Sequence, residues 1–255
     1  MKDRIIYYKD ETEEFSGTDF HGEKAGAGYE YIRDGFGVSF LYNVIARPAA
    51  FLYSKLALGQ KTVGKEKLKE AEKAGIFVYG NHTQRTGDPF IPNVFLFPRR
   101  VFFIVHPDNV NIPVIGRYTP ALGALPLPGD MKAYRNFISA IDMRVSEGGA
   151  VVIYPEAHIW PYYTRIRDFP DTSFGYPCKD GTPAFCFTNT YKKRRVFKRP
   201  RVVTYIDGPF YPDMRLPLKQ RTKRLRDEVY SAMCARSALS DCEYIRYIKK
   251  EDTNG

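Results

Sequence analysis

Residues 76–90 read IFVYGNHTQRTGDPF, and the expected fold is organised around them. An apolar, β-rich run ends at Gly80, as buried strands of α/β proteins do. Asn81, His82 and Asp88 follow within a few residues, as in the functional loops of such proteins. A histidine can take up a proton at working pH because its ordinary pKa lies near neutrality, and a nearby aspartate can fix its tautomer. A surface histidine beside a helix-capping aspartate is the alternative interpretation.

Short apolar runs alternate with helical segments along the rest of the chain. The predicted strands are residues 76–79, 100–105, 124–127, 150–154, 184–188 and 202–206, with a short edge strand at 5–8. The predicted helices are residues 65–74, 89–97, 131–147 and 218–237. Strands that alternate with helices indicate an α/β fold with a mainly parallel sheet flanked by helices.

The N-terminal part divides into a polar and an apolar segment. Residues 1–34 are predicted to be a polar extension of a single α/β domain that covers residues 35–255. The most apolar stretch, residues 36–58, is interrupted by Arg47-Pro48, so neither half reaches the about 20 apolar residues that cross a bilayer. We therefore expect N-terminal apolar helices that meet at the proline. Residues 35–60 then lie either against the core or in a membrane interface.

Composition bounds the class of protein. The 255 residues carry a net charge of +10, which favours an anionic partner such as nucleic acid, an anionic bilayer or a phosphorylated substrate. The four cysteines and the histidines show no metal-ligand spacing, so we expect free thiols in a reducing cytosol and no metal. The charged N-terminus has no apolar core of a secretory signal, so a cytoplasmic location is expected.

A second strand-to-loop junction, Tyr154-Pro155-Glu156, resembles the first in its chemistry. Active sites of open parallel sheets collect outside the carboxyl ends of the strands. Both junctions are predicted to lie at such ends, so His82, Asp88 and Glu156 are expected to converge. Glu156 could equally be a strand-end carboxylate that is paired with a basic neighbour.

With these blocks in place, the sequence resembles the glycerolipid acyltransferase family, which includes the 1-acylglycerol-3-phosphate (lysophosphatidate) acyltransferases. The Asn81-His82…Asp88 segment is similar to the family's Asn-His-x4-Asp block, and residues 154–158 are similar to its Phe-Pro-Glu-Gly-Thr block. Weaker similarities are found at residues 123–128 and 183–187. The order and spacing of the blocks agree from about Gly64 to Asp213.

The chain departs from the family pattern at three places. Five residues, not four, separate His82 from Asp88, and Gly87 could supply a residue that tolerates positive φ in the turn between them. Pro128 stands where a phosphate-binding arginine is usual. Ala157-His158 replaces the Gly-Thr of the other block. The missing arginine leaves the phosphate of the acceptor without its usual partner.

The resemblance implies transfer of a fatty acyl group from an acyl thioester to the hydroxyl of a lysophospholipid-like acceptor. The thioester would be acyl-coenzyme A or acyl carrier protein, with no other cofactor. His82 would be the general base and Asp88 its orienting partner. Glu156 would hold the acceptor or brace the loop that does. Asn81 is assigned to substrate binding, and three arginines are candidates for the missing one because guanidinium pairs with phosphate bidentately: Arg117, Arg165 and Arg167.

Two basic runs, residues 192–201 and 221–226, indicate an anionic binding partner. Each such cation contributes on the order of 1 kcal/mol to binding of anionic lipid near its surface, and nucleic acid is attracted by the same charges. No recognised nucleic-acid-binding motif accompanies them. We expect a peripheral protein on the inner face of the membrane. The alternatives are a non-catalytic lipid-binding homologue and a basic α/β protein that binds nucleic acid.

Overall fold

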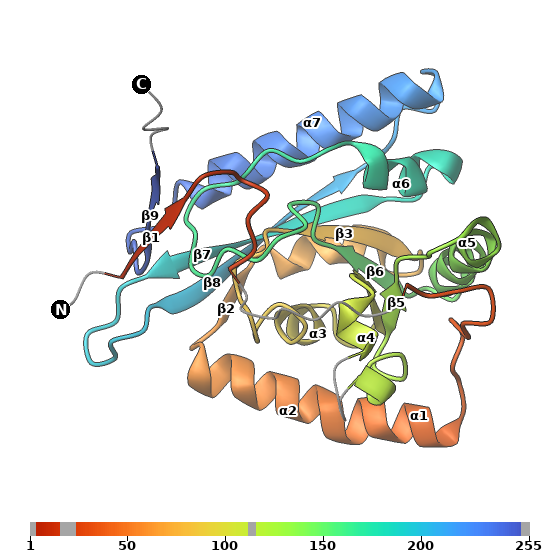
Figure 1. The fold of residues 1–255 in the computed structure, drawn as a ribbon, viewed down its shortest axis with the longest axis horizontal. Helices are drawn as coiled ribbons and strands as arrows, with labels where there is room; N and C mark the ends of the chain where they lie inside the picture. Colours follow the sequence, from red (N-terminus) through yellow and green to blue (C-terminus); the bar gives the residue numbers. More distant parts are fainter. Residues whose placement is uncertain (1–3, 16–23, 112–115, 251–255) are drawn as a thin grey trace.

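The computed structural model describes residues 4–15, 24–111 and 116–250 (Figure 1). Its centre is a sheet whose strand order is β2-β8-β7-β3-β6-β4-β5. These strands are β2 (Lys61–Val63), β3 (Ile76–Gly80), β4 (Val101–Val105), β5 (Ala124–Pro126), β6 (Ala150–Ile153), β7 (Ala184–Lys192) and β8 (Arg201–Phe210). Neighbouring strands are parallel except for the antiparallel pair β7–β8. The predicted fold class, a mainly parallel α/β sheet flanked by helices, is confirmed.

Helices cover both faces of the sheet (Figure 1). They are α1 (Phe36–Phe40), α2 (Arg47–Leu52), α3 (Ile91–Phe95), α4 (Asp108–Asn111), α5 (Met131–Ser146), α6 (Gly175–Asp180) and α7 (Leu218–Ser237). The helices α5, α6 and α7 lie on one face, and α1 to α4 lie on the other. Alternation along β3 explains both layers: Phe77 and Tyr79 enter the core with α5 to α7, whereas Ile76 and Val78 enter the core with α3.

The N-terminal apolar stretch forms one helical run from Phe36 to Ala57, not two helices that meet at Pro48. A proline removes a backbone N–H and crowds the preceding turn, which usually ends a helix. Here residues 41–46 form a wider turn in which the N–H of Arg47 reaches the carbonyl of Tyr42, and this turn absorbs the proline. Within the described ranges, no helix is long and apolar enough to span a membrane.

Two further expectations change in the structure. The predicted helix at 65–74 is a tighter 3-10 helix, Lys65–Ala71, which buries Leu68 and Ala71 against the sheet. The predicted helix at 89–97 is reduced to the five residues of α3. Both segments are short connections between strands, so their contacts with the sheet override their intrinsic helical pattern.

The ends of the described chain are tied together. The predicted edge strand is present as β1 (Ile5–Tyr8), which pairs in parallel with β9 (Arg246–Lys249) in a separate two-stranded sheet. This small sheet packs on Trp160 and Tyr163. The N-terminal segment is therefore part of the domain, and it covers the loop that follows β6.

Candidate active site

The loops after β3 and β6 lie together at one edge of the sheet. The two strands are paired in parallel with Tyr79 opposite Ile153, so both end at the same edge. The loops are then joined through their main chains. The N–H of Trp160 donates to the carbonyl of His82 at 3.0 Å, and the N–H of Tyr162 donates to the carbonyl of Thr83 at 2.9 Å. The convergence expected from the two strand-to-loop junctions is therefore present.

His82 and Asp88 form a hydrogen-bonded pair. Nδ1 of His82 lies 2.7 Å from Oδ2 of Asp88, which also accepts the N–H of Gln84 at 3.0 Å. The Asp88 side chain is 2% exposed, whereas that of His82 is 17% exposed. Burial raises the pKa of Asp88, and its bonds from His82 and the main chain oppose that rise. In the tautomer that carries its proton on Nδ1, the imidazole donates to the carboxylate and Nε2 is free to accept a proton.

The extra residue between His82 and Asp88 is accommodated by a compact turn. The N–H of Asp88 donates to the carbonyl of Gln84 at 2.9 Å. Gly87 does not adopt the positive φ that the sequence suggested. Its role is steric, because a Cβ at this position would lie 2.9 Å from the Leu58 side chain and 3.0 Å from that of Gln84. The small residue lets the turn pack against its neighbours.

Tyr154 supports the pair from the other loop, and sequence reasoning gave it no role. Its ring stacks on the imidazole of His82 with centroids 4.4 Å apart and planes inclined by 17°. Its hydroxyl donates to the main-chain carbonyl of Asp88 at 2.6 Å. One side chain thus fixes the plane of the His82 imidazole and the backbone of Asp88. A tyrosine immediately before Pro155-Glu156 was the available signal.

Glu156 forms a buried ion pair with Arg167. Oε2 of Glu156 accepts from Nη2 and Nε of Arg167 at 3.0 and 3.2 Å, and both side chains are almost fully buried. Arg167 also donates to the carbonyls of Glu11 and His158. Burial raises the pKa of Glu156 to about 7, against the lowering effect of Arg167. These contacts favour the bracing role for Glu156, and they leave Arg167 occupied by the protein.

Ala157, which stands in place of the family's glycine, adopts a conformation that favours glycine. Its φ is 63°, in the left-handed region that side chains other than glycine seldom adopt. The ion pair immediately before it and the hydrogen bond from Ile159 N–H to Glu14 hold the loop in place. An alanine at this position therefore carries local backbone strain, which these contacts hold in place.

Asn81 has a structural role that differs from the predicted contact with substrate. Its side chain is buried, its Nδ2 donates to the carbonyl of Asn189 at 3.0 Å, and its Oδ1 accepts the N–H of Asn189 at 2.7 Å. Both polar groups are thus used to join the end of β3 to β7. These two bonds give Asn81 a structural role, and its assignment to substrate binding stays a prediction.

Of the other two candidate arginines, Arg165 lies on the surface of the described structure. Arg165 is exposed, and its guanidinium lies over the ring of Tyr163, 5.6 Å from the centroid. The Arg117 side chain lies outside the described part of the structure. Among the candidate arginines whose side chains are described, Arg165 is the one whose charge is open to a ligand.

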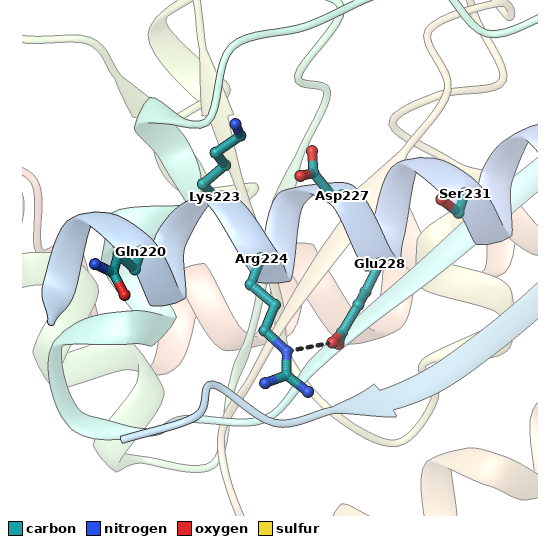
Figure 2. Close-up of a pocket in the computed structure, with 6 residues that line it drawn as sticks. All are labelled: Gln220, Lys223, Arg224, Asp227, Glu228 and Ser231. Atoms are coloured by element: carbon teal, nitrogen blue, oxygen red, sulfur yellow. Dashed lines mark hydrogen bonds and ion pairs between the residues drawn. The ribbon is translucent and has the colours of Figure 1, made fainter. Parts of the chain in front are cut away.

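A shallow hollow on α7 is remote from this chemistry. It is lined by side chains of one exposed helix face, as Figure 2 shows: Gln220, Lys223, Arg224, Asp227, Glu228 and Ser231. Arg224 and Glu228 pair across it at 3.0 Å. No residue of the loops after β3 or β6 lines this hollow, so we do not assign it to the site. Among the residues that the structure describes, no group of three or more His, Cys, Asp or Glu side chains could hold a metal ion.

Comparisons with known proteins agree with the fold and with the family resemblance. The family model described as Acyltransferase matches residues 60–193, just over half of the chain. The protein therefore belongs to the acyltransferase family. Among solved structures, it is similar to PlsC from Thermotoga maritima, a 1-acyl-sn-glycerophosphate (LPA) acyltransferase. The TM-score is 0.55 and the identity 17%, over 76% of this chain and 81% of that one. No curated protein matches the chain.

Proposed function

We propose that the protein moves a fatty acyl group from an acyl thioester to the hydroxyl of a lysophospholipid-like acceptor, a step of phospholipid synthesis. The observation that carries this proposal is the pair formed by His82 and Asp88 beside the Tyr154–Glu156 loop. Membership of the acyltransferase family supports it, and the fold is shared with a protein that acts on 1-acyl-sn-glycerophosphate. The acyl donor is a coenzyme A or acyl carrier protein thioester.

The proposed reaction needs one base and one direct displacement. Nε2 of His82 takes the proton of the acceptor hydroxyl as its oxygen attacks the thioester carbonyl. The tetrahedral intermediate collapses with loss of the thiolate, which takes the proton back from the imidazolium. A C–O bond is formed, a C–S bond is broken, and no acyl-enzyme is required. Asp88 holds the imidazole in the productive tautomer and stabilises its charged form.

Thioester consumption with a panel of acceptors tests this function. We expect free thiol to appear in equal amount to a new diacyl lipid when a lysophospholipid is supplied. Binding of lysolipid without thiol release would indicate a non-catalytic lipid-binding homologue. A salt-sensitive shift of DNA or RNA, with neither lipid binding nor thiol release, would indicate the nucleic-acid-binding alternative.

Arg165 is the proposed partner of a phosphate on the acceptor. Arg167 is occupied by Glu156, whereas Arg165, two residues before Arg167 in the chain, is exposed. We expect Arg165→Gln to raise the KM for a phosphorylated lysolipid about tenfold, and to leave the KM for the thioester unchanged, because a hydrogen bond to a charged group contributes about 1.5–3 kcal/mol. Lys179→Gln, which removes an exposed cation from α6, is the control. An unchanged acceptor KM would exclude Arg165.

Attachment to the inner face of the membrane is proposed from the helical run 36–57. Apolar side chains recur along its exposed side: Phe36, Phe40, Val44, Ile45, Phe51, Leu52 and Leu56. An amphipathic helix of this kind can lie in the headgroup region with its apolar face buried. Tyr42 does not belong to that face, because it is buried and its hydroxyl bonds to Asn93 and to the N–H of Val101.

The apolar face is expected to give binding that salt does not remove. Phe40 and Phe51 are 49% and 51% exposed, so their replacement does not open the core. In vesicle flotation at high salt, we expect Phe40→Ser with Phe51→Ser to weaken binding to anionic vesicles about tenfold. Met131→Ser with Tyr211→Ser removes exposed apolar groups elsewhere and is the control. Equal binding by both double variants would contradict the proposed attachment.

A further inference from the structure

The turn between β7 and β8, residues 193–200, projects from the edge of the sheet that carries His82. β7 pairs in parallel with β3, and Phe187 lies opposite Gly80, the last residue of β3. β7 then continues for five more residues, to Lys192, before the chain turns back into Arg201. Figure 1 shows this turn extending beyond the body of the sheet. We refer to residues 193–200 as the hairpin tip.

The hairpin tip presents two large apolar side chains to solvent. Val196 is 87% exposed and Phe197 is 65% exposed. The guanidinium of Arg194 lies over the Phe197 ring, 5.3 Å from its centroid. Neither apolar side chain belongs to a cluster of the protein core. Exposed apolar groups that adjoin one another at the end of a hairpin indicate a contact with another apolar phase.

A dense set of positive charges surrounds these two residues. The cations between residues 192 and 201 are Lys192, Lys193, Arg194, Arg195, Lys198, Arg199 and Arg201. Lys192 pairs with Asp241 at 3.4 Å. Arg195, Lys198 and Arg199 make no ion pair with an acidic side chain of the described residues. The apolar pair is thus flanked along the chain by cations that complement an anionic surface.

The base of the hairpin is joined to the end of the apolar helical run. The N–H of Val202 donates to the carbonyl of Leu58 at 3.2 Å, and Arg194 donates to the same carbonyl. The last exposed apolar residue of the helix, Leu56, is 74% exposed. The base of the hairpin and the end of the helical run are therefore neighbours in the structure.

We propose that Val196 and Phe197 insert into an anionic bilayer as a second anchor, with the surrounding cations at the phosphate level. Because the tip extends from the carboxyl edge of the sheet, this anchor would turn the edge that carries His82 toward the lipid. The inference extends the peripheral attachment described under the proposed function, but it does not depend on turnover. Lipid is favoured over nucleic acid because the base of the hairpin adjoins the end of the apolar helical run. A bilayer would bury these apolar side chains, whereas a nucleic acid would leave them exposed to water.

Quenching by lipid measures insertion directly. The single natural tryptophan, Trp160, is buried, so a new tryptophan at the tip can be distinguished from it. We would place Phe197→Trp in a His82→Ala background and add vesicles of phosphatidylglycerol and phosphatidylcholine with brominated acyl chains. We expect strong quenching of Phe197→Trp and little quenching of Met131→Trp, an exposed control on α5. Vesicle binding without quenching of Phe197→Trp would overturn the proposal.

Affinity measurements separate the tip from the other proposals. Val196→Ser with Phe197→Ser should weaken partitioning to the same vesicles about tenfold at high salt, and Lys198→Gln with Arg199→Gln should weaken it mainly at low salt. Unchanged vesicle partitioning of the Val196→Ser, Phe197→Ser variant would contradict insertion. Insertion would also be contradicted if this variant lost binding to a single-stranded RNA oligonucleotide while its vesicle partitioning stayed the same. All of these variants are made in the His82→Ala protein, and quenching and partitioning do not require turnover. Their outcomes are therefore independent of whether the protein is an acyltransferase.

Discussion

Replacing His82 with alanine is expected to lower acyl transfer by about 10²–10⁴-fold, the usual contribution of a general base, while the protein remains folded. The imidazole is partly exposed, so its removal leaves no large cavity. The proposed role of Nε2 as a base rests on the contact between Nδ1 and Asp88. The initial rate of thiol release measures the loss. The unfolding midpoint of the same sample shows whether the fold is intact.

Asp88→Asn is the matched variant for the same pair. The carboxamide removes the negative charge that would stabilise the imidazolium. Where its N–H faces Nδ1, it also places the imidazole proton on Nε2 and blocks that atom as an acceptor. We expect impaired turnover with nearly unchanged affinity for both substrates. Wild-type turnover in a folded His82→Ala protein would remove His82 from the reaction, whatever the effect of the Asp88 variant.

Arg167→Met is expected to destabilise the protein by about 3–5 kcal/mol near pH 8, because it leaves the Glu156 carboxylate buried without its partner. Urea unfolding measures the change. Glu156→Gln with Arg167→Met is the control. It removes both charges, so it should recover most of the lost stability. If Arg167→Met alone is as stable as the wild type, the ion pair does not brace the loop.

The pH dependence of the Arg167 variant has a definite sign. The pKa of Glu156 in the folded protein, about 7, lies above its ordinary value of 4.5. The folded state therefore holds the proton more tightly, and stability falls as the pH rises from 4.5 through 7. Without Arg167 the pKa rises further, so the fall continues above pH 7. The difference between the variant and the wild type should be smaller at pH 5 than at pH 8.

The elements that the sequence predicts well are those whose pattern is set by burial. The run Ile76 to Gly80 is buried on both faces and forms β3, and its register with β6 brings the two loops together. Elements set by tertiary contacts are predicted less well. Pro48 indicates a break in the apolar helix, yet a wider turn at residues 41–46 carries the helix through it.

The site shows the same division. The pairing of His82 with Asp88 was predicted from the residue types and their order in the chain. The roles of Asn81 and Arg167 depended on partners that are distant in the chain, Asn189 and Glu11 among them. Those contacts carry no local signal, so a buried bracing residue and a ligand-binding residue have the same appearance in the sequence. Tyr154 was missed for the same reason.

A single stoichiometry measurement tests the central claim most directly. Wild-type protein and His82→Ala protein would each be given a lysophospholipid in vesicles and an acyl thioester carrying a labelled chain. The proposed chemistry predicts that the wild type releases one thiol for each labelled acyl group esterified to the lysolipid, with both products reduced at least about a hundredfold in the variant. Thiol release without labelled diacyl lipid, or equal product from both proteins, would contradict it.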